Sequence, residues 1–447
     1  MRAFNASLAA LALAPLVLGA CSGSDTNNNS SNNTADAGPS PDTGVAPQGP
    51  SFTIDVVEGL GSSAVVGDFA QAANAPAGGY VVAYGFTPAG GGEREIHFAT
   101  HDGDGVWSPE LVTRPGEAIP GGDDLKGLGL AYVGGEPHVV FLGGDDDGRA
   151  TIEEPTDLVM ATKSGAQWSL RTLVDVSTEA TGDCSEYCNE GYVVGSYAAI
   201  AANPSGSGFA VVYRDTHLGF AVDDLNQADV EVYVEGGPVP TNTMVDPERG
   251  GGTHGTIAYT PQGGLMAAYT VEFSPGTEDI AGVWAAVYAE GAWRLRRVHN
   301  RVTSAKIGAA TTPDGTLYLA FFDTAEADLM VATSTDEGES WQTERVDSRG
   351  KTGIHPSLAI DAEGRPIISY GYCGPASDRG CPSTLSAESE VRMARLEAGA
   401  WALYPVDDGQ GFGRVGFSTS ITVDSAGKIG IAYVDDGNGD LLFAREQ

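Results

Sequence analysis

The chain is patterned in short segments that alternate apolar and polar residues and are separated by glycine-rich turns. The clearest group covers residues 355–407. A first segment ends in a turn at Gly364, and three more follow at 366–370, 391–395 and 402–407. A period of two between turn residues is typical of β-strands. We therefore predict four consecutive strands here, each paired with the next.

The same four-segment pattern recurs along the chain. Most copies carry a turn glycine after the first segment, an aromatic residue in the second and a tryptophan before the fourth. Repetition of one unit predicts a repeat architecture, and four-stranded sheets repeated around an axis form a β-propeller. The other copies cover residues 69–112, 126–175, 197–246, 254–298 and 306–347, and a last copy begins at Ser418.

The last copy stops after its third segment, at residues 441–444, and lacks a fourth. The segment FTIDVV at 52–57 matches the missing one, as in QTERVD at 342–347. We therefore predict an all-β fold over residues 51–447: a seven-bladed β-propeller of four-stranded blades, with the N-terminal strand completing the last blade. Such closure leaves only short, protected sheet edges.

One turn carries a more specific motif. The segment STDEGESW at 334–341 resembles the Asp-box of sialidase-type propellers, Ser-x-Asp-x-Gly-x-Thr-Trp, with Ser340 in the Thr position. Elsewhere only the Gly-x-Trp part of the motif remains, in the segments that end at Trp107, Trp293 and Trp401. Residues 51–447 therefore resemble the BNR (Asp-box), sialidase-like propeller superfamily. In that superfamily the Asp-box is a structural turn remote from the active centre, so the resemblance implies a fold and no activity.

The first 50 residues differ from the rest. Met1-Arg2 and an apolar stretch at 8–18, too short to span a bilayer, predict a signal peptide over residues 1–20. Its end, Leu18-Gly19-Ala20-Cys21, resembles the bacterial lipoprotein lipobox, which implies lipidation of Cys21 and a membrane anchor made of acyl chains. The alternative is an ordinary secreted protein in which this cysteine is a coincidence.

Residues 21–50 are rich in Asn, Ser and Pro and carry too little apolar surface to offset chain entropy. We predict a disordered tether. Ser22 stands where enterobacterial lipoproteins retained at the inner membrane carry Asp, which favours the outer membrane or the cell surface.

The charge and cysteine content of the chain argue against some classes of binding partner and predict disulfides. The chain has 60 acidic and 24 basic residues, a net charge of −36, which argues against nucleic acid and anionic lipid and favours a soluble monomer. Besides Cys21 the chain has four cysteines, which form two pairs close in sequence. In an oxidising compartment such pairs predict two disulfides, although four cysteines allow three connectivities. The pairs are Cys184 with Cys188 and Cys373 with Cys381.

Candidate binding residues follow from the repeat. Counting nine residues back from the turn glycine selects the start of each first strand, which we expect at the mouth of the central channel. Lys and His there suit a carboxylate or sulfate; the alternative is that they cap strand ends or pair with acidic neighbours. The selected residues are Lys126, Tyr197, His254, Lys306, His355 and Ser418.

The second strands add two rings of equivalent positions. The first ring is aromatic, and we predict that it packs between blades: Tyr84, Phe141, Tyr213, Tyr269, Phe321, Tyr370 and Tyr433. Two residues further on, acidic side chains either face the channel mouth or partner a turn. These are Asp215, Asp323 and Asp435, with Arg214 and Tyr372 nearby.

Catalytic and metal motifs are weak. The acidic runs 145–148 and 435–440 offer oxygen ligands for calcium, but neither matches the EF-hand loop and solvated acidic turns are common, so we assign no metal or cofactor. The arginine triad and the N-terminal Arg-Ile-Pro motif of sialidases are absent, as are hydrolase and phosphate-binding motifs.

The sequence favours binding over catalysis. Disulfide-stapled loops on the top face would serve an envelope-anchored lipoprotein that recognises a glycan or a protein, and an anionic ligand suits the basic residues. The alternative is a carbohydrate-active enzyme, a lyase of uronate polysaccharides, with His254, His355 and Tyr197 or Tyr372 in proton transfer.

Overall fold

The computed structural model describes residues 49–447 with internal gaps. Residues 1–48 lie outside the description, as do positions 60, 62–63, 104, 116–126, 144–156, 176–192, 217–227, 237–238, 240, 247–248, 250, 273–277, 302–305, 375–388 and 410–413. Gly49–Gln447 forms one compact unit. Within the described residues there is no helix able to cross a bilayer.

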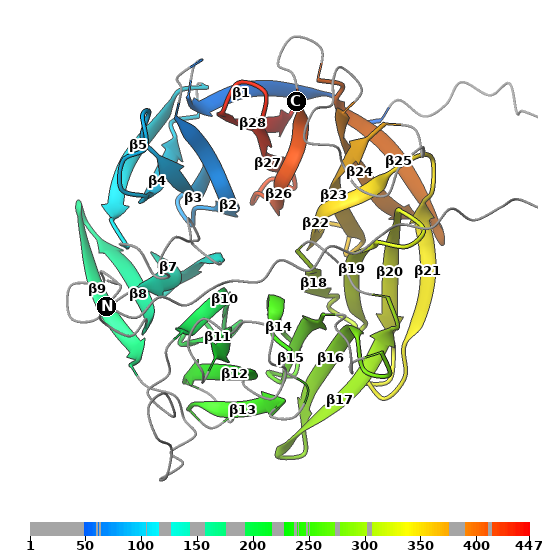
Figure 1. Ribbon diagram of the computed structural model, residues 1–447. Helices are drawn as coiled ribbons and strands as arrows, with labels where there is room; N and C mark the ends of the chain where they lie inside the picture. Colours follow the sequence, from blue (N-terminus) through cyan, green and yellow to red (C-terminus); the bar gives the residue numbers. More distant parts are fainter. Residues whose placement is uncertain are drawn as a thin grey trace, which may run out of the picture. The chain divides into compact units, whose positions relative to one another are not determined.

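Seven four-stranded antiparallel sheets form a ring, numbered here as blades 1 to 7 (Figure 1). The predicted fold class is confirmed. Innermost strand first, blade 1 consists of β2 (Val65–Asn74), β3 (Tyr80–Thr87), β4 (Glu95–His101) and β5 (Trp107–Thr113), and blade 2 of β6 (Leu128–Val133), β7 (Glu136–Gly143), β8 (Asp157–Ser164) and β9 (Gln167–Val174). Blade 3 consists of β10 (Val193–Ala202), β11 (Phe209–Thr216), β12 (Ala228–Glu235) and β13 (Thr243–Asp246), and blade 4 of β14 (Thr253–Tyr259), β15 (Leu265–Val271), β16 (Gly282–Ala289) and β17 (Ala292–His299).

Blades 5 to 7 follow the same order. Blade 5 consists of β18 (Gly308–Thr311), β19 (Leu317–Asp323), β20 (Asp328–Ser334) and β21 (Gln342–Asp347). Blade 6 consists of β22 (Thr352–Ile360), β23 (Pro366–Cys373), β24 (Ser389–Glu397) and β25 (Ala400–Asp407). Blade 7 consists of β26 (Val415–Val423), β27 (Ile429–Asp435), β28 (Asp440–Glu446) and β1 (Phe52–Glu58).

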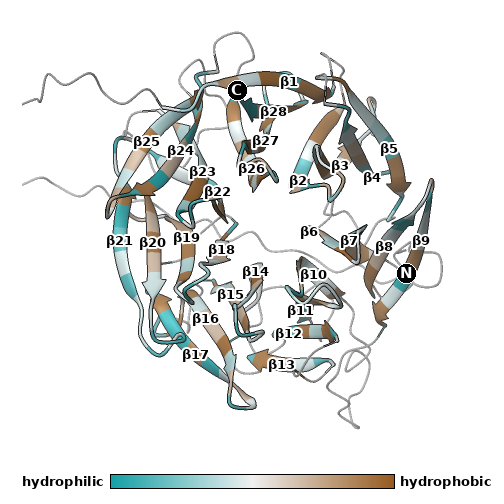
Figure 2. Cartoon of the chain, turned by 180° about the vertical axis from the view of Figure 1, so that it is seen from behind, coloured by the Kyte–Doolittle hydropathy of each residue, from teal (hydrophilic) through white to brown (hydrophobic). Residues whose placement is uncertain are grey.

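The hydrophobic core lies between the blades. Second strands are buried on both faces, and β15 and β27 are buried at every position. Outermost strands alternate instead: β9 is exposed at every other residue over most of its length. Figure 2 shows the same contrast between the mainly brown second strands and the teal segments of β17 and β21. Each blade therefore depends on its neighbours, as Met266 and Ala268 of blade 4 show by packing on Leu317 and Leu319 of blade 5.

The N-terminal strand closes the ring. β1 pairs with β28 in an antiparallel register that sets Ile54 opposite Ala444 and Val56 opposite Leu442. Figure 1 shows β1 and the C-terminus side by side, and the Arg445 guanidinium meets the carboxylate of Asp55 at 2.5 Å. This is the closure predicted from the missing fourth segment, because β28 would otherwise present an open edge.

Buried tyrosines fasten adjacent blades together. The predicted aromatic ring is fully buried, and four of its tyrosine hydroxyls each donate a hydrogen bond to a carboxylate near the end of the preceding blade's outermost strand. The four bonds are Tyr84 to Glu58 (2.5 Å), Tyr269 to Asp246 (2.6 Å), Tyr370 to Asp347 (2.9 Å) and Tyr433 to Asp407 (2.6 Å). Tyr213 bonds within its own blade, to Glu231 and Asn242.

Removing one of these hydroxyls is expected to destabilise the ring. Burial and the neighbouring Asp246 raise the pKa of Tyr269 well above its usual value, so its hydroxyl remains a donor. Tyr269→Phe should lower the free energy of unfolding by about 1.5–3 kcal/mol, the contribution of a hydrogen bond to a charged group. Denaturant unfolding measures it. As control, Tyr233→Phe removes a hydroxyl 3.5 Å from Glu235 on the same strand; equal losses in both variants would contradict the interpretation.

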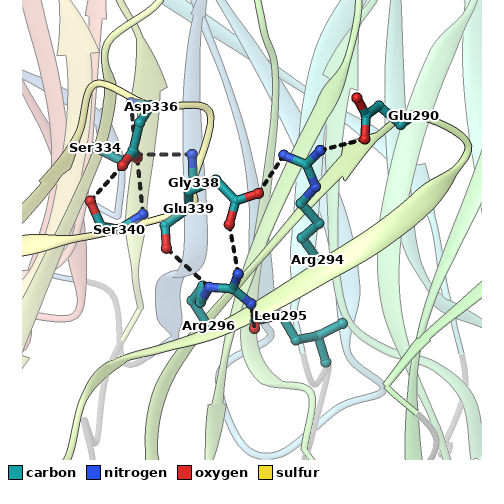
Figure 3. Close-up of polar contacts among 9 residues, drawn as sticks. All are labelled: Glu290, Arg294, Leu295, Arg296, Ser334, Asp336, Gly338, Glu339 and Ser340. Atoms are coloured by element: carbon teal, nitrogen blue, oxygen red, sulfur yellow. Dashed lines mark hydrogen bonds and ion pairs between the residues drawn. The ribbon is translucent and has the colours of Figure 1, made fainter.

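The turn at Ser334–Ser340 is a closed hydrogen-bond network (Figure 3). Asp336 accepts bonds from the Ser334 hydroxyl at 2.8 Å and from the Ser340 amide at 2.9 Å. The bonds from Ser340, followed by that from Ser334, lower the pKa of Asp336 to about 2. Glu339 forms ion pairs with Arg294 and Arg296 of blade 4, at 2.8 and 2.7 Å. The turn therefore joins two blades and fulfils a structural role.

Candidate functional site

The innermost strands share a bulge that aims one side chain at the axis. In five blades two residues of the first strand face a single residue of the second, and that single residue is the buried tyrosine described above. The first bulge residue has a left-handed backbone, with φ between 47° and 56°. These residues are Phe69, Tyr197, His254, His355 and Ser418.

This conformation is costly, since a non-glycine residue in the left-handed region loses about 1–2 kcal/mol. Bulges of this kind re-aim side chains and often lie beside functional sites. Two residues before each of the five stands a glycine with φ between 97° and 104°. At Gly353 a Cβ would lie 2.6 Å from the Leu329 Cα of the adjacent blade, so close packing of the blades requires glycine there.

A central cavity of about 310 Å³ lies among the bulges, and all seven blades contribute to its lining. Its walls combine apolar surface from Leu128, Ile200 and Ile257 with polar groups from Gln71 and Thr256. This volume is at the lower end of the range for ligand pockets, about 300–1,000 Å³. The full lining consists of residues 68–71, 127–130, 197–200 and 254–257 together with Lys306, His355 and Ser418.

Lys306 supplies the positive charge of the cavity. It precedes β18 and extends towards blades 1 and 7, where its Nζ donates to Gln71 Oε1 at 3.2 Å and lies 3.5 Å from the Thr419 carbonyl oxygen. Both partners are neutral, and no carboxylate of the described residues forms an ion pair with it. Burial lowers the pKa of Lys306 to about 8, so the ammonium form still prevails at neutral pH.

Two histidines line the same cavity. Burial lowers the pKa of His254 to about 4, and burial together with the positive charges of His254 and Lys306 lowers that of His355 to about 4. Both imidazoles are therefore neutral at pH 7. The ring of Tyr197 meets the ring of His254 edge to face, with 5.4 Å between centroids. Asp68 lies at the cavity too, with its carboxylate 3.4 Å from Arg94.

The structure brings together four of the residues predicted for the site. Tyr197, His254, Lys306 and His355 all line the cavity. Lys126 lies outside the described residues, although the adjoining Gly127 belongs to the lining.

The residues predicted from the ends of the second strands are not among the lining residues, because they stand one strand further from the axis. Asp323 accepts bonds from the amides of Ala325 and Glu326, and Asp435 from the amides of Gly437 and Asn438. Their carboxylates organise the following turns.

The other second-strand candidates are Arg214, Asp215 and Tyr372. Arg214 is buried, and its carbonyl accepts a bond from the Ser196 hydroxyl. Asp215, its neighbour, is fully buried. Tyr372 stacks under the guanidinium of Arg392, 3.7 Å from the ring centroid.

Lining residues that were not selected from the sequence include Phe69, Gln71 and Thr256, whereas Ser418, selected by the nine-residue spacing, also lines the cavity. Phe69 stands nine residues before Gly78, the same spacing that selected the others, and Gly-x-Phe69 matches the Gly-x pattern of the other four bulges. Applying either rule to blade 1 finds it. Gln71 has no comparable sequence signal, since its role arises from a contact with Lys306 across the axis.

The remaining sequence predictions bear less on the cavity. In the described part of the chain no cluster of three or more His, Cys, Asp or Glu is arranged to hold a metal ion. Of the two acidic runs, residues 145–148 lie outside the described residues. Cys373 is buried at the end of β23, whereas Cys184, Cys188 and Cys381 lie outside the described residues, so the two disulfide pairings stay predictions. Cys21 also lies outside them.

Comparison with known proteins gives structural likenesses only. No family model and no curated protein sequence matches the chain. Similar solved structures include a protein of unknown function from Dyadobacter fermentans, with 12% identity, coverage of 88% of this chain and 97% of that one, and a TM-score of 0.45. The intramolecular trans-sialidase of Ruminococcus gnavus has 12% identity, coverage of 89% of this chain and 97% of that one, and a TM-score of 0.43. Another is the six-bladed fucose-binding lectin of Aleuria aurantia (13%, 78% and 96%, 0.41). Such values assign no function, which is therefore argued from the cavity.

Proposed function

We propose that the protein is a binding protein whose central cavity takes a small anionic group, a carboxylate or sulfate carried by a saccharide. The observation that carries the proposal is the pair of neutral partners of Lys306. A lysine at the axis of a protein with net charge −36 would be expected to meet an acidic side chain. Instead, among the described residues, it reaches an amide oxygen and a carbonyl oxygen, which leaves its charge available to a ligand.

The size and polarity of the cavity support a small ligand. A volume of about 310 Å³ accommodates one sugar ring rather than a protein surface. Apolar walls and the ring of Phe69 would contact the non-polar face of a sugar, while Ser418, Thr256 and the neutral histidines offer hydrogen bonds to hydroxyl groups. The ammonium group would supply a charge-assisted bond, which is stronger in a site shielded from water.

We place this binding activity on the bacterial envelope. The proposal rests on the signal-like segment before Cys21 and on the polar composition of residues 21–50, which together suit a lipid-anchored, exported domain acting as a monomer. An outer-membrane or cell-surface position would give the cavity access to extracellular or envelope glycans.

A uronate lyase is the second candidate, favoured by one observation. Tyr197 and the neutral His254 adjoin each other in the cavity that holds Lys306. A neutral imidazole is able to accept a proton, a phenol is able to donate one, and a lysine neutralises the uronate carboxylate. If His254→Ala abolishes turnover of uronate polymers while binding persists, the protein is a lyase.

The binding proposal is tested by calorimetry on the full chain. Methyl glucuronide should bind at pH 7, and methyl glucoside, which differs by its lack of a carboxylate, should not. Because the pKa of Lys306 is about 8, affinity should fall about tenfold for each pH unit above 8. Equal affinity for the two glycosides, or no binding of any carboxylated or sulfated sugar, would contradict the proposal.

A further inference from the structure

Gln71 is the residue of blade 1 that meets Lys306. It is the first paired residue after the bulge at Phe69, and it lies opposite Ala83 of the second strand. Its Nε2 donates to the Phe69 carbonyl oxygen at 3.4 Å, and its Oε1 accepts from Lys306 Nζ at 3.2 Å. The bulge therefore fixes which end of the amide faces the lysine, because only the oxygen is able to accept.

This arrangement holds the ammonium group without neutralising it. An ammonium group has three hydrogens, and the contacts with Gln71 and the Thr419 carbonyl account for two of them. Glutamate has nearly the shape of glutamine but carries a full negative charge. At position 71 it would form an internal ion pair with Lys306, against which an anionic ligand would have to compete.

We infer that Gln71 is a positioning residue whose lack of charge selects anionic over neutral ligands, because its oxygen contacts Lys306 but leaves the lysine's charge for the ligand to balance. The inference rests on the proposed function and deepens it. On this inference, specificity depends on the neutrality of the Gln71 side chain, and that side chain need not touch the ligand itself.

Two substitutions of similar length separate this role from simple packing. Gln71→Glu adds the competing charge, and Gln71→Met removes the hydrogen bond without adding charge. In calorimetry at pH 7 we expect Gln71→Glu to bind methyl glucuronide at least about tenfold more weakly than the wild-type chain, whereas Gln71→Met stays within a few-fold. Equal binding by Gln71→Glu and the wild type overturns the inference. An equal loss in both variants overturns it as well, because the amide would then serve the ligand directly.

A second readout needs no ligand. The chain has five lysines, so the ¹³Cε resonances of labelled lysine are resolvable, and Lys306→Met assigns the one in the cavity. The pKa of Lys306, about 8, should rise by about one unit or more in Gln71→Glu and not in Gln71→Met. An unchanged pKa overturns the inference. Among the described residues, the other titratable groups at the cavity are Asp68, Tyr197, His254 and His355.

The two proposals fail in different ways. If the wild-type chain binds no anionic sugar, the proposed function fails and takes ligand selection with it, while the lysine titration still reports whether Gln71 controls the charge. If the wild type binds and Gln71→Glu binds equally well, the function stands and the inference alone fails. Thermal melts that coincide for the three proteins exclude unfolding as the cause.

Discussion

Replacing Lys306 by methionine should weaken binding of an anionic sugar about 10- to 100-fold without lowering the melting temperature. The loss corresponds to one hydrogen bond to a charged group, about 1.5–3 kcal/mol. Affinity and stability are expected to separate because Nζ has only neutral partners among the described residues, Gln71 and the Thr419 carbonyl. A half-buried charge of this kind stabilises the fold little, and a hydrophobic replacement of similar volume is commonly neutral or stabilising.

The pH dependence of stability provides an independent check. The pKa of Lys306 is about 8 in the folded chain and near 10.4 when unfolded. Between these values the unfolded chain binds more protons, so the contribution of this lysine to stability increases as the pH rises. That increase should be missing in Lys306→Met. As control, Lys428→Met removes an exposed ammonium group bonded to the Gln447 carbonyl and should change neither property. Unchanged binding in Lys306→Met would refute the assigned role.

Deleting the chain up to residue 58 should abolish the folded monomer. This removes β1, which fills the outermost position of blade 7 and pairs with β28 along its length. Val57 is buried, and Phe52, Ile54 and Val56 are partly so. Losing their burial costs more than about 5 kcal/mol, and the freed edge of β28 becomes a template for pairing with other chains. Size-exclusion chromatography and thermal melts measure both effects.

A shorter deletion serves as the matched control. A chain that begins at Gly49 keeps β1 and the whole compact unit, and it should melt at the same temperature as the full chain. A synthetic peptide of residues 50–58 added to the longer deletion should restore the monomer by occupying the free edge. If the longer deletion remains folded and monomeric without peptide, the closing strand is not needed for stability.

The architecture could be predicted because the repeat constrains it strongly. Turn glycines such as Gly364 and Gly427 mark the same point in successive blades, and the nine-residue spacing locates the side chains that meet at the axis. The missing fourth segment after Ala444 identified β1 as its replacement. These features are local in sequence, so one amino-acid sequence on its own is sufficient to find them.

The details of the cavity depend on contacts between distant blades, which the sequence does not reveal. The left-handed bulges arise where glycines such as Gly353 allow one blade to approach the next. The contact of Gln71 with Lys306 joins residues 235 positions apart. Conversely, Asp323 and Asp435 had the charge and the position expected of binding residues, but their carboxylates contact turn amides and, for Asp323, also the ring of His299. Charge pattern alone does not distinguish these two uses of an aspartate.

The strained bulges also bear on how such a protein changes over evolution. Backbone geometry at Phe69, Tyr197, His254, His355 and Ser418 is imposed by the preceding glycine and by blade packing. A new side chain at any of these positions would inherit the same aim without refolding of its blade. Exchange of one of these residues would therefore change the lining of the cavity while the frame of the propeller stays fixed.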